Sequence, residues 1–358
     1  MPILFDKRAV LLYNRTMDIQ NFLKKHNGIS FHMPAHKERA DYIFRDITEI
    51  YGADNLRNPK GIIKNSQERA GKFLGGEAFY LVNGASSGLL AAVLSLGETP
   101  LLLDRNCHES VINGLILSGA MPKYIYPKKD EVFGIPQPVT LENITDEKAF
   151  IYTAVTYFGK VCDTDKIREN AKDTILISDE AHGSHFYFSE ELKRFRALKS
   201  DISVLSFHKS LPALTQTAIL LSKTQNNDFL EKCKNLITTT SPSYPLMASL
   251  DYAFHNGEEP YKKSTDFINE IKAEIKEKSD ILIYDSHDPW KLLMNFKNCE
   301  SGPNRVEKNL REKYNIFCEG IFGNNILFMI SPYNTKKSLA YLKMQLFRFQ
   351  KKKEQKKI

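Results

Sequence analysis

The sequence predicts an α/β fold, with a mostly parallel, doubly wound sheet followed by a smaller α+β domain. Short apolar runs alternate with helical patterns between residues 36 and 255, as strands and crossover helices do in such a sheet. After about Glu258 the pattern changes to charged helices and a few strand-like runs. We therefore expect an N-terminal arm over 1–35, a large domain over 36–255, a small domain over 256–345 and a basic tail over 346–358.

The individual elements follow from local patterns. Ile19, Phe22 and Leu23 have the spacing of an amphipathic helix, which we place in the arm. Apolar runs of strand length predict strands at 78–82, 101–103, 149–155, 175–177, 203–207 and 218–221. An apolar helix is expected at 89–94. In the small domain we expect helices at 267–278 and 304–313 and strands at 292–296 and 326–330.

Two side chains that can carry chemistry follow neighbouring predicted strands. Asp179 ends the run that begins at Ile175, and Lys209 follows the run that begins at Ser203. Ligands of open α/β sheets bind at the carboxyl ends of the strands. A lysine there reacts with an aldehyde once burial or charge lowers its pKa, and a carboxylate can hold a ring nitrogen protonated. Each residue alone fits a turn cap or a surface lysine, but the pair in this order indicates pyridoxal phosphate (PLP).

A turn rich in small residues predicts an anion site. Asn83-Gly-Ala-Ser-Ser-Gly joins the strand at 78–82 to the helix at 89–94. Backbone N–H groups and the hydroxyls of Ser86 and Ser87 would face a phosphate there, and the helix dipole would favour its charge. The same pattern also fits a tight connection without a ligand. It is neither a dinucleotide-binding glycine motif nor a Walker loop.

These motifs belong to a longer series. Between about residues 31 and 335 the chain resembles the Orn/Lys/Arg decarboxylases, which are fold-type I PLP enzymes. The blocks that carry the resemblance are His32-Met-Pro-Ala-His-Lys, Asp46-Ile-Thr-Glu, Asn58-Pro-Lys-Gly-Ile-Ile, Asn83-Gly-Ala-Ser-Ser-Gly, Asp104-Arg-Asn-Cys-His-Glu-Ser, Thr156-Tyr-Phe-Gly, Asp179-Glu-Ala-His-Gly, Ser206-Phe-His-Lys, Thr238-Thr-Thr-Ser-Pro-Ser-Tyr-Pro and Asn325-Ile-Leu-Phe-Met-Ile-Ser-Pro. Ala35 stands where the family usually has glycine.

The resemblance implies a role for each matched residue around the cofactor ring. Lys209 would be the amine that reacts with the aldehyde, and Asp179 would pair with the ring nitrogen. His108 would stack on one face of the ring and Ala181 would pack against the other. His182 would make a further cofactor contact.

The resemblance also implies a phosphate site and a shared assembly. The phosphate would be held by Ser86, Ser87, Ser206 and His208. Thr239 and Ser241 lie in a polar, proline-bounded loop that would reach the site of a partner subunit, so we expect a homodimer with shared active sites. From composition alone, a solvent-exposed Ser/Thr loop is the alternative.

The expected activity is PLP-dependent decarboxylation of a basic amino acid, namely lysine, ornithine or arginine, to the amine. Relatives usually continue into a further region with Pro-Pro-Gly-Ile-Pro and Pro-Gly-Glu motifs that contributes to the substrate pocket, whereas this sequence ends at Ile358. Two alternatives therefore stay open. One is another PLP reaction, such as that of an aminotransferase or a lyase. The other is a non-catalytic or split paralogue.

Composition agrees with a soluble enzyme, which we expect to be cytoplasmic and to act on a small molecule. Hydrophobic residues make up 42% of the chain, and no apolar run approaches the roughly 20 residues of a membrane span. Charged residues near the N-terminus argue against a signal peptide. The five cysteines lack metal-type spacing and predict reduced thiols and no metal site. The net charge of +7 lies mostly in the tail at 351–357, so we expect no nucleic-acid partner.

Overall fold

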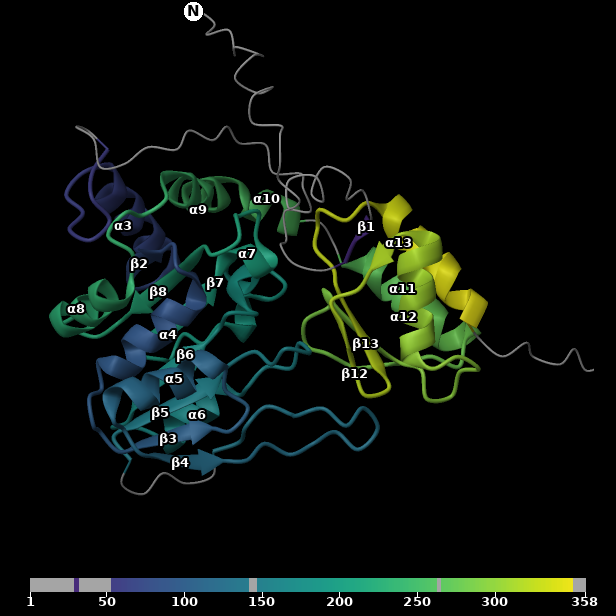
Figure 1. Ribbon diagram of the computed structural model, residues 1–358, viewed down its shortest axis with the longest axis horizontal. Coiled ribbons are helices and arrows are strands. Elements are labelled where there is room, and N and C mark those ends of the chain that lie inside the picture. Colours follow the sequence, from purple (N-terminus) through teal and green to yellow (C-terminus); the bar gives the residue numbers. More distant parts are fainter. Residues whose placement is uncertain (1–28, 32–52, 142–146, 263–264, 350–358) are drawn as a thin grey trace, which may run out of the picture.

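The computed structural model describes residues 29–31, 53–141, 147–262 and 265–349 (Figure 1). Several sequence predictions lie outside the described residues. These are the arm helix around Ile19, the blocks that begin at His32 and Asp46, and the lysine-rich tail from Lys351. Within the described residues, no helix is both long enough and apolar enough to span a bilayer.

The large sheet has seven strands in the order β2-β8-β7-β6-β5-β3-β4. In that order they are Glu77–Leu81, Ala218–Ser222, Ile202–Ser206, Ile175–Asp179, Ala149–Thr153, Leu101–Asp104 and Pro122–Ile125. Only β8 runs antiparallel to its neighbours, which confirms the predicted mostly parallel α/β fold. The sequence does not predict β4, because Lys123 and Tyr124 on this edge strand are exposed and interrupt the apolar pattern.

Helices cover both faces of this sheet, which explains why its inner strands are apolar throughout. On one face lie α4 (Gly84–Leu94), α5 (Glu109–Ser118) and α8 (Asp228–Ile237). The other face carries α3 (Ile62–Leu74), α6 (Thr164–Asn170) and α9 (Tyr244–Asn256). Successive strand residues alternate between the layers: Phe79 and Leu81 of β2 join the first core, and Tyr80 joins the second.

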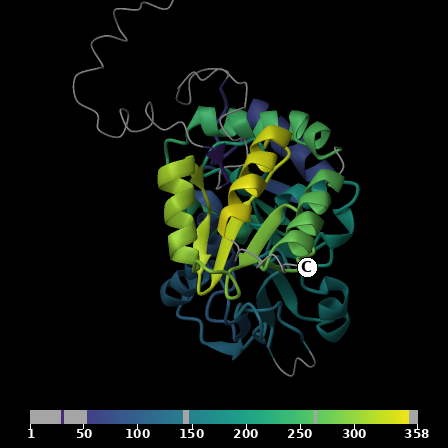
Figure 2. The same ribbon diagram turned by 90° about the vertical axis from the view of Figure 1, so that its right-hand side faces the viewer.

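The small sheet is antiparallel, with the order β12-β13-β10-β9. These strands are Gly320–Phe322, Asn325–Met329, Lys291–Asn295 and Leu282–Ile283. Figure 2 shows α11 (Asp266–Lys278), α12 (Pro303–Tyr314) and α13 (Lys336–Leu346) on the face turned away from the large sheet. The predicted helices at 267–278 and 304–313 therefore exist.

The chain leaves the large sheet through α9, and we propose the domain boundary near residue 256.

Residues 29–31 are the described part of the predicted arm, and they pack on the small sheet. β1 (Ile29–Ser30) pairs in parallel with β11 (Ile316–Phe317). The Met329 N–H donates to the carbonyl oxygen of Phe31 at 2.7 Å. The Phe31 ring meets the Phe328 ring edge-on at 5.8 Å. A segment far away in sequence thus extends the core of the small sheet.

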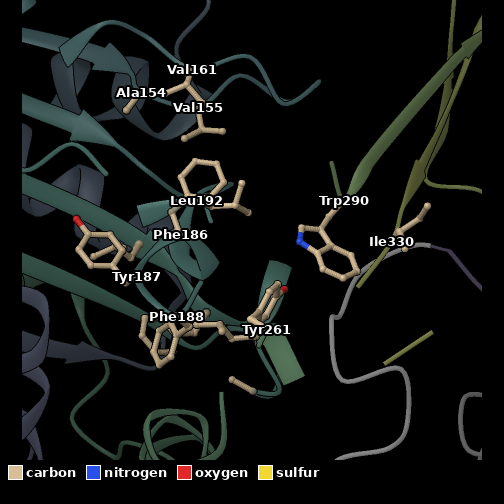
Figure 3. Packing of buried hydrophobic residues seen from close by; sticks show 14 of the residues in the cluster. Ala154, Val155, Val161, Phe186, Tyr187, Phe188, Leu192, Tyr261, Trp290 and Ile330 are labelled. Carbon is tan, nitrogen blue, oxygen red and sulfur yellow. The ribbon is translucent and has the colours of Figure 1, made fainter. Parts of the chain in front are cut away.

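Aromatic side chains join the two sheets. Figure 3 shows Trp290 and Ile330 on the side of the small sheet, with Tyr261 and Phe186 on the other side. The rings of Tyr261 and Trp290 meet edge-on at 5.5 Å. Tyr261 belongs to α10 (Glu258–Tyr261), and its hydroxyl donates to the carbonyl of Ser210 at 2.5 Å. Ser210 ends the short helix α7 (Phe207–Ser210), so this junction ties the small sheet to the carboxyl end of β7.

Candidate functional site

Asp179 and Lys209 lie at the same carboxyl edge of the large sheet, as the sequence predicts. Asp179 ends β6 and is paired with Val204 of β7, and α7 carries Lys209 directly after β7. Asp179 is only 8% exposed. Its Oδ1 accepts a hydrogen bond from the Ala181 N–H at 2.9 Å, and among the described residues Oδ2 accepts none. The second oxygen is therefore available to a ligand.

His182 bridges Lys209 to a second lysine, Lys291. The Nζ atom of Lys209 lies 3.1 Å from Nε2 of His182. On the other side of the ring, Nζ of Lys291 lies 3.3 Å from Nδ1. Burial and the two lysines hold the pKa of His182 well below its usual value. The imidazole is therefore neutral at physiological pH.

Burial also lowers the pKa of both lysines. Desolvation lowers the pKa of Lys209, and the charges of Asp179 and Glu319 oppose part of that effect. The pKa of Lys291 falls to about 8, mainly through desolvation, against the attraction of Asp288 and Glu319. A larger fraction of each side chain is thus a free amine than in an ordinary surface lysine.

Tyr157 and Gly159 form the wall beside this pair of lysines. The Tyr157 ring meets His182 edge-on at 4.8 Å, and its hydroxyl donates to Oε1 of Glu319 at 2.6 Å. Gly159 has a φ of +86°, and a Cβ atom there would lie 2.8 Å from Cγ of Lys291. Glycine is required for the backbone conformation and for the space that the Lys291 side chain occupies.

His108 caps the N-terminus of α5. Its Nδ1 accepts a hydrogen bond from the Ser110 N–H at 3.1 Å, so a neutral ring carries its proton on Nε2. Asp104 at the end of β3 shapes the preceding turn by accepting from the Asn106 N–H at 2.8 Å. Burial raises the pKa of Asp104. His108 itself is exposed, so a ring ligand at this edge can reach its imidazole.

The predicted phosphate turn begins α4. Gly84 has a φ of +81°, and its N–H donates to the carbonyl of Gln216 at 2.8 Å. The Ser87 hydroxyl donates to the Gly84 carbonyl at 2.8 Å, while Ser86 is exposed. A Cβ at Gly88 would lie 2.9 Å from Cγ1 of Val204. This close approach of α4 to β7 holds the turn near the residues that follow β7.

The remaining predicted phosphate ligands lie in two groups. Ser206 is fully buried, and its hydroxyl lies 3.2 Å from Nδ1 of His208. The Thr239 N–H donates to Oδ1 of Asn83 at 3.1 Å, beside the start of α4 in the same chain. The Thr239 and Ser241 hydroxyls are 3.4 Å apart. Contact of this loop with a partner subunit stays a prediction.

Comparison with known proteins identifies the family to which the chain belongs. The family model of the Orn/Lys/Arg decarboxylase major domain matches residues 22–293. The chain belongs to the Orn/Lys/Arg decarboxylase family. An arginine decarboxylase of Bacillus subtilis is 34% identical over 87% of this chain and 72% of the relative. The uncharacterized protein YaaO of the same organism is 35% identical over 86% of this chain and 71% of the relative.

Solved structures of the family have the same fold. Lysine decarboxylase A from Pseudomonas aeruginosa superimposes with a TM-score of 0.75 at 19% identity, over 84% of this chain and 52% of that one. The constitutive lysine decarboxylase of Escherichia coli gives a TM-score of 0.73 at 19% identity, over 96% of this chain and 56% of that one. The chain thus spans about half the length of these decarboxylases, and its central sheet is that of the fold-type I enzymes.

The side chains fit the PLP on which Orn/Lys/Arg decarboxylases generally depend. Lys209 offers an amine of lowered pKa, and Asp179 offers a free carboxylate oxygen at the same strand edge. The start of α4 offers backbone N–H groups and the Ser86 hydroxyl for a phosphate. An amine, a carboxylate and an anion site together match the three polar parts of this cofactor.

Sequence analysis missed three residues of this site: Lys291, Tyr157 and Glu319. Lys291 follows Asp288-Pro-Trp and opens an apolar run, where a lysine ordinarily marks a strand end facing water. Tyr157 lies in the Thr156-Tyr-Phe-Gly block, so the resemblance marked its segment without giving it a role. For Lys291 and Glu319 no local signal existed, because the packing of the small sheet against the large one creates their surroundings.

Proposed function

We propose that this chain catalyses PLP-dependent decarboxylation of a basic amino acid (lysine, ornithine or arginine) to the corresponding amine. The observation that carries the proposal is the Lys209 amine, of lowered pKa, beside Asp179 at the carboxyl edge of a decarboxylase-family sheet. Several relatives at 31–34% identity are arginine decarboxylases, which supports a basic substrate.

The proposed roles of the side chains follow from their chemistry. When bound, PLP supplies an electron-accepting ring for the bond that breaks at Cα. Lys209 would hold PLP at its aldehyde through an amine of lowered pKa. Asp179 would pair with the ring nitrogen and favour its protonated form, and His108 and Ala181 would pack against the ring. Lys209 or His108 would be the group that supplies a proton to Cα.

The remaining polar residues have positioning roles in this proposal. The phosphate is bound by the hydroxyls and N–H groups at the start of α4 and by the pair Ser206 and His208. His182 touches Lys209 and is itself neutral, so it orients the amine without adding a charge. The Ser87 hydroxyl holds the turn closed through its bond to Gly84 in this conformation.

Labelling of Lys209 tests the cofactor role. The purified chain is incubated with PLP, reduced with borohydride and mapped by mass spectrometry. We expect a visible absorption band before reduction and the label on Lys209, and both are lost in Lys209→Ala. Lys272 is a built-in control, because burial lowers its pKa to about 8 as well. Label on Lys272 in preference to Lys209 would contradict the assignment.

The reaction is tested with the PLP-loaded chain and three amino acids, lysine, ornithine and arginine. We expect equal amounts of CO2 and amine from at least one of them, and none from Lys209→Ala. Release of keto acid without CO2 would reject decarboxylation. The same assay selects the substrate among the three.

We also propose a homodimer with active sites shared across a two-fold axis. The loop that carries Thr239 lies beside the phosphate turn at Asn83, and Thr240 and Ser241 in it are exposed. In a dimer with two-fold symmetry, each subunit would contribute this loop to the active site of the other. Light scattering of the PLP-loaded chain measures the assembly, and a stable monomer that retains PLP tightly would refute it.

We propose the cytoplasm as the compartment. The five cysteines, all within the described residues, carry free thiols, as is usual in a reducing compartment. Fractionation of the source cells tests this, and recovery outside the cytoplasmic fraction would overturn it.

A further inference from the structure

An arm of the large domain reaches the small sheet beside the candidate site. Residues 126–139 follow β4, and Figure 1 shows this arm extending toward the tip of β12 and β13. The Gln137 N–H donates to the carbonyl of Lys128 at 2.8 Å, so the arm is closed as a hairpin. Ile135 in the arm is 3% exposed, because it packs in one hydrophobic cluster with Leu327 of β13. A segment of the large domain therefore completes part of the core of the small one.

A buried amide, that of Asn325, fastens this arm to the small sheet. Asn325 begins β13 and is 1% exposed. Its Nδ2 group donates to the carbonyl of Phe133 in the arm at 2.8 Å and to the carbonyl of Phe322 in β12 at 2.7 Å. Its Oδ1 accepts from Nδ2 of Asn295 in β10 at 2.7 Å. Both N–H donors and the oxygen of the amide are thus used, and they join the arm, β12 and β10 at one point.

Strand β12, which Asn325 holds, leads into a wall of the candidate site. β12 is at the end of the strand order of the small sheet and has only three residues. Glu319 directly precedes it and accepts a hydrogen bond from the Tyr157 hydroxyl at 2.6 Å. Phe322 ends it and meets the Tyr157 ring edge-on at 5.5 Å. Tyr157 also packs on His182, which contacts Lys209. The position of β12 therefore sets the position of this wall.

We propose that Asn325 is a positioning residue of the active site, which holds the wall of Glu319 and Tyr157 in place by fastening β12 to the arm of the large domain. The inference rests on the proposed function, in which Lys209 binds the cofactor. Lys209, Asp179 and the start of α4 all belong to the large sheet and its connections, whereas Glu319 belongs to the small sheet. Loss of the fastening should therefore loosen the wall and leave the cofactor groups in place.

A second contact of the arm gives an independent way to test this role. Nε2 of Gln137 donates to the Tyr284 hydroxyl at 2.8 Å, and the Tyr284 ring meets the Phe133 ring edge-on at 5.1 Å. Tyr284 directly follows β9, so the arm is held to the small sheet at two points. Burying an amide such as that of Asn325 costs free energy unless its hydrogen bonds are made, and an apolar side chain would avoid that cost. The bonds that Asn325 donates explain why an amide is present there.

Hydrogen exchange of the full-length chain, followed by mass spectrometry, measures the fastening without any assay of activity. In Asn325→Ala, peptides that cover 126–139 and 319–322 should exchange about fivefold faster, the factor that corresponds to one lost hydrogen bond. Asn295→Ala is the matched control, because Asn295 faces Asn325 in the register of β10 and β13 and is also 1% exposed. That variant keeps both bonds that Asn325 donates, so exchange in the arm should stay close to that of the unmodified chain.

Kinetics of the PLP-loaded chain shows whether the wall matters to the reaction. Asn325→Ala should lower kcat/KM for the amino acid about fivefold, because the wall packs on the histidine that contacts Lys209. Its affinity for PLP should change little, since the groups proposed to bind the phosphate and the ring nitrogen lie on the large sheet. A general loss of structure would lower both quantities. Tyr284→Phe removes the acceptor of the Gln137 bond and keeps the ring, so it should change kcat/KM in the same direction.

Two results would overturn the inference. One is an equal change of exchange and kcat/KM in Asn325→Ala and Asn295→Ala. The other is an unchanged kcat/KM in Asn325→Ala although 319–322 exchange faster. If Asn325→Ala failed to fold, Tyr284→Phe would decide the question by the same two measurements. Absence of PLP label on Lys209 and of CO2 release in the unmodified chain would instead refute the proposed function, and the exchange data would still test the fastening by themselves.

Discussion

Gly159 shows how strongly a single residue can be constrained at this site. Its φ of +86° disfavours any L side chain, and its Cα faces the aliphatic part of Lys291 and the Cβ of Asp288. Gly134 has a similar φ of +66°, but no atom lies within 4 Å of the position that a Cβ would occupy there. Substitutions at Gly159 and Gly134 therefore distinguish the cost of backbone strain from the cost of a steric clash with neighbouring atoms.

We expect Gly159→Ala to destabilise the chain by about 2–4 kcal/mol, the sum of about 1 kcal/mol of backbone strain and an overpacking cost. Gly134→Ala should cost only the strain, about 1 kcal/mol. Urea unfolding of the two variants measures the difference. Equal losses in both would mean that the neighbours of Gly159 move aside freely.

At the scale of one element, the start of α3 depends on a carboxylate several residues upstream. Asp54 accepts hydrogen bonds from the N–H groups of Gly61 at 2.7 Å, Ile63 at 3.0 Å and Lys60 at 2.9 Å. Burial alone would raise the pKa of Asp54, but these bonds outweigh it and lower the pKa to about 2. Asp54 also has a φ of +69°, which Asp and Asn tolerate better than Ala.

We expect Asp54→Ala to lose about 1–2 kcal/mol of stability, and Asp54→Asn to lose less because it keeps an acceptor and the backbone preference. The folded-state pKa of Asp54 is depressed, so its stabilising effect is complete above the ordinary value of 3.8 and is lost as pH falls toward 2. Urea unfolding at a series of pH values measures this effect. The difference in free energy of unfolding between the unmodified chain and Asp54→Asn should become smaller as pH falls from 3.8 toward 2. A difference that does not change with pH would contradict the charge-based explanation.

At the scale of the whole molecule, one buried pair joins the two sheets. Nε2 of His185 lies 3.2 Å from Oδ1 of Asp288, and both side chains are almost fully buried. His185 belongs to the 3-10 helix Ser184–Tyr187 after β6, and Asp288 precedes β10. Burial acts to raise the pKa of Asp288, but His185, Lys291 and the bond from the Trp290 N–H together outweigh it, and the net shift of the pKa is downward. The N–H of Asp288 also donates to the Gly159 carbonyl at 3.0 Å.

Removing one partner should therefore loosen the junction. We expect Asp288→Ala to cost about 3–5 kcal/mol, and the double variant His185→Phe with Asp288→Leu to cost clearly less. Because the pKa of Asp288 is depressed, its contribution is present above 3.8 and is lost as pH falls below that value. Chemical unfolding across acid pH should show this loss in the unmodified chain and not in the double variant. Additive single effects would show that the two residues are not coupled.

The difference between predicted and missed features has the same physical origin at every scale. Strands β5, β6 and β7 were predictable because both of their faces are buried, which requires continuous apolar runs. Edge strand β4 was not, because an edge tolerates polar residues. The local sequence pattern also could not predict that β8 runs antiparallel to β7, because a buried strand has the same composition in either direction.

The sequence by itself determined the α/β class, the family, and the position of Asp179 and Lys209 at one edge of the sheet. Strand ends and residue order carry that information, because parallel neighbours end at the same edge. Only the tertiary structure decided that Lys291 and Glu319 belong to the same site and that His182 stands between two lysines. Lys291 contacts His182 across 109 positions of the chain, and Glu319 contacts Tyr157 across 162. Whether a lysine there is solvated or buried depends on how two sheets pack, and a lysine's own sequence neighbours do not encode that.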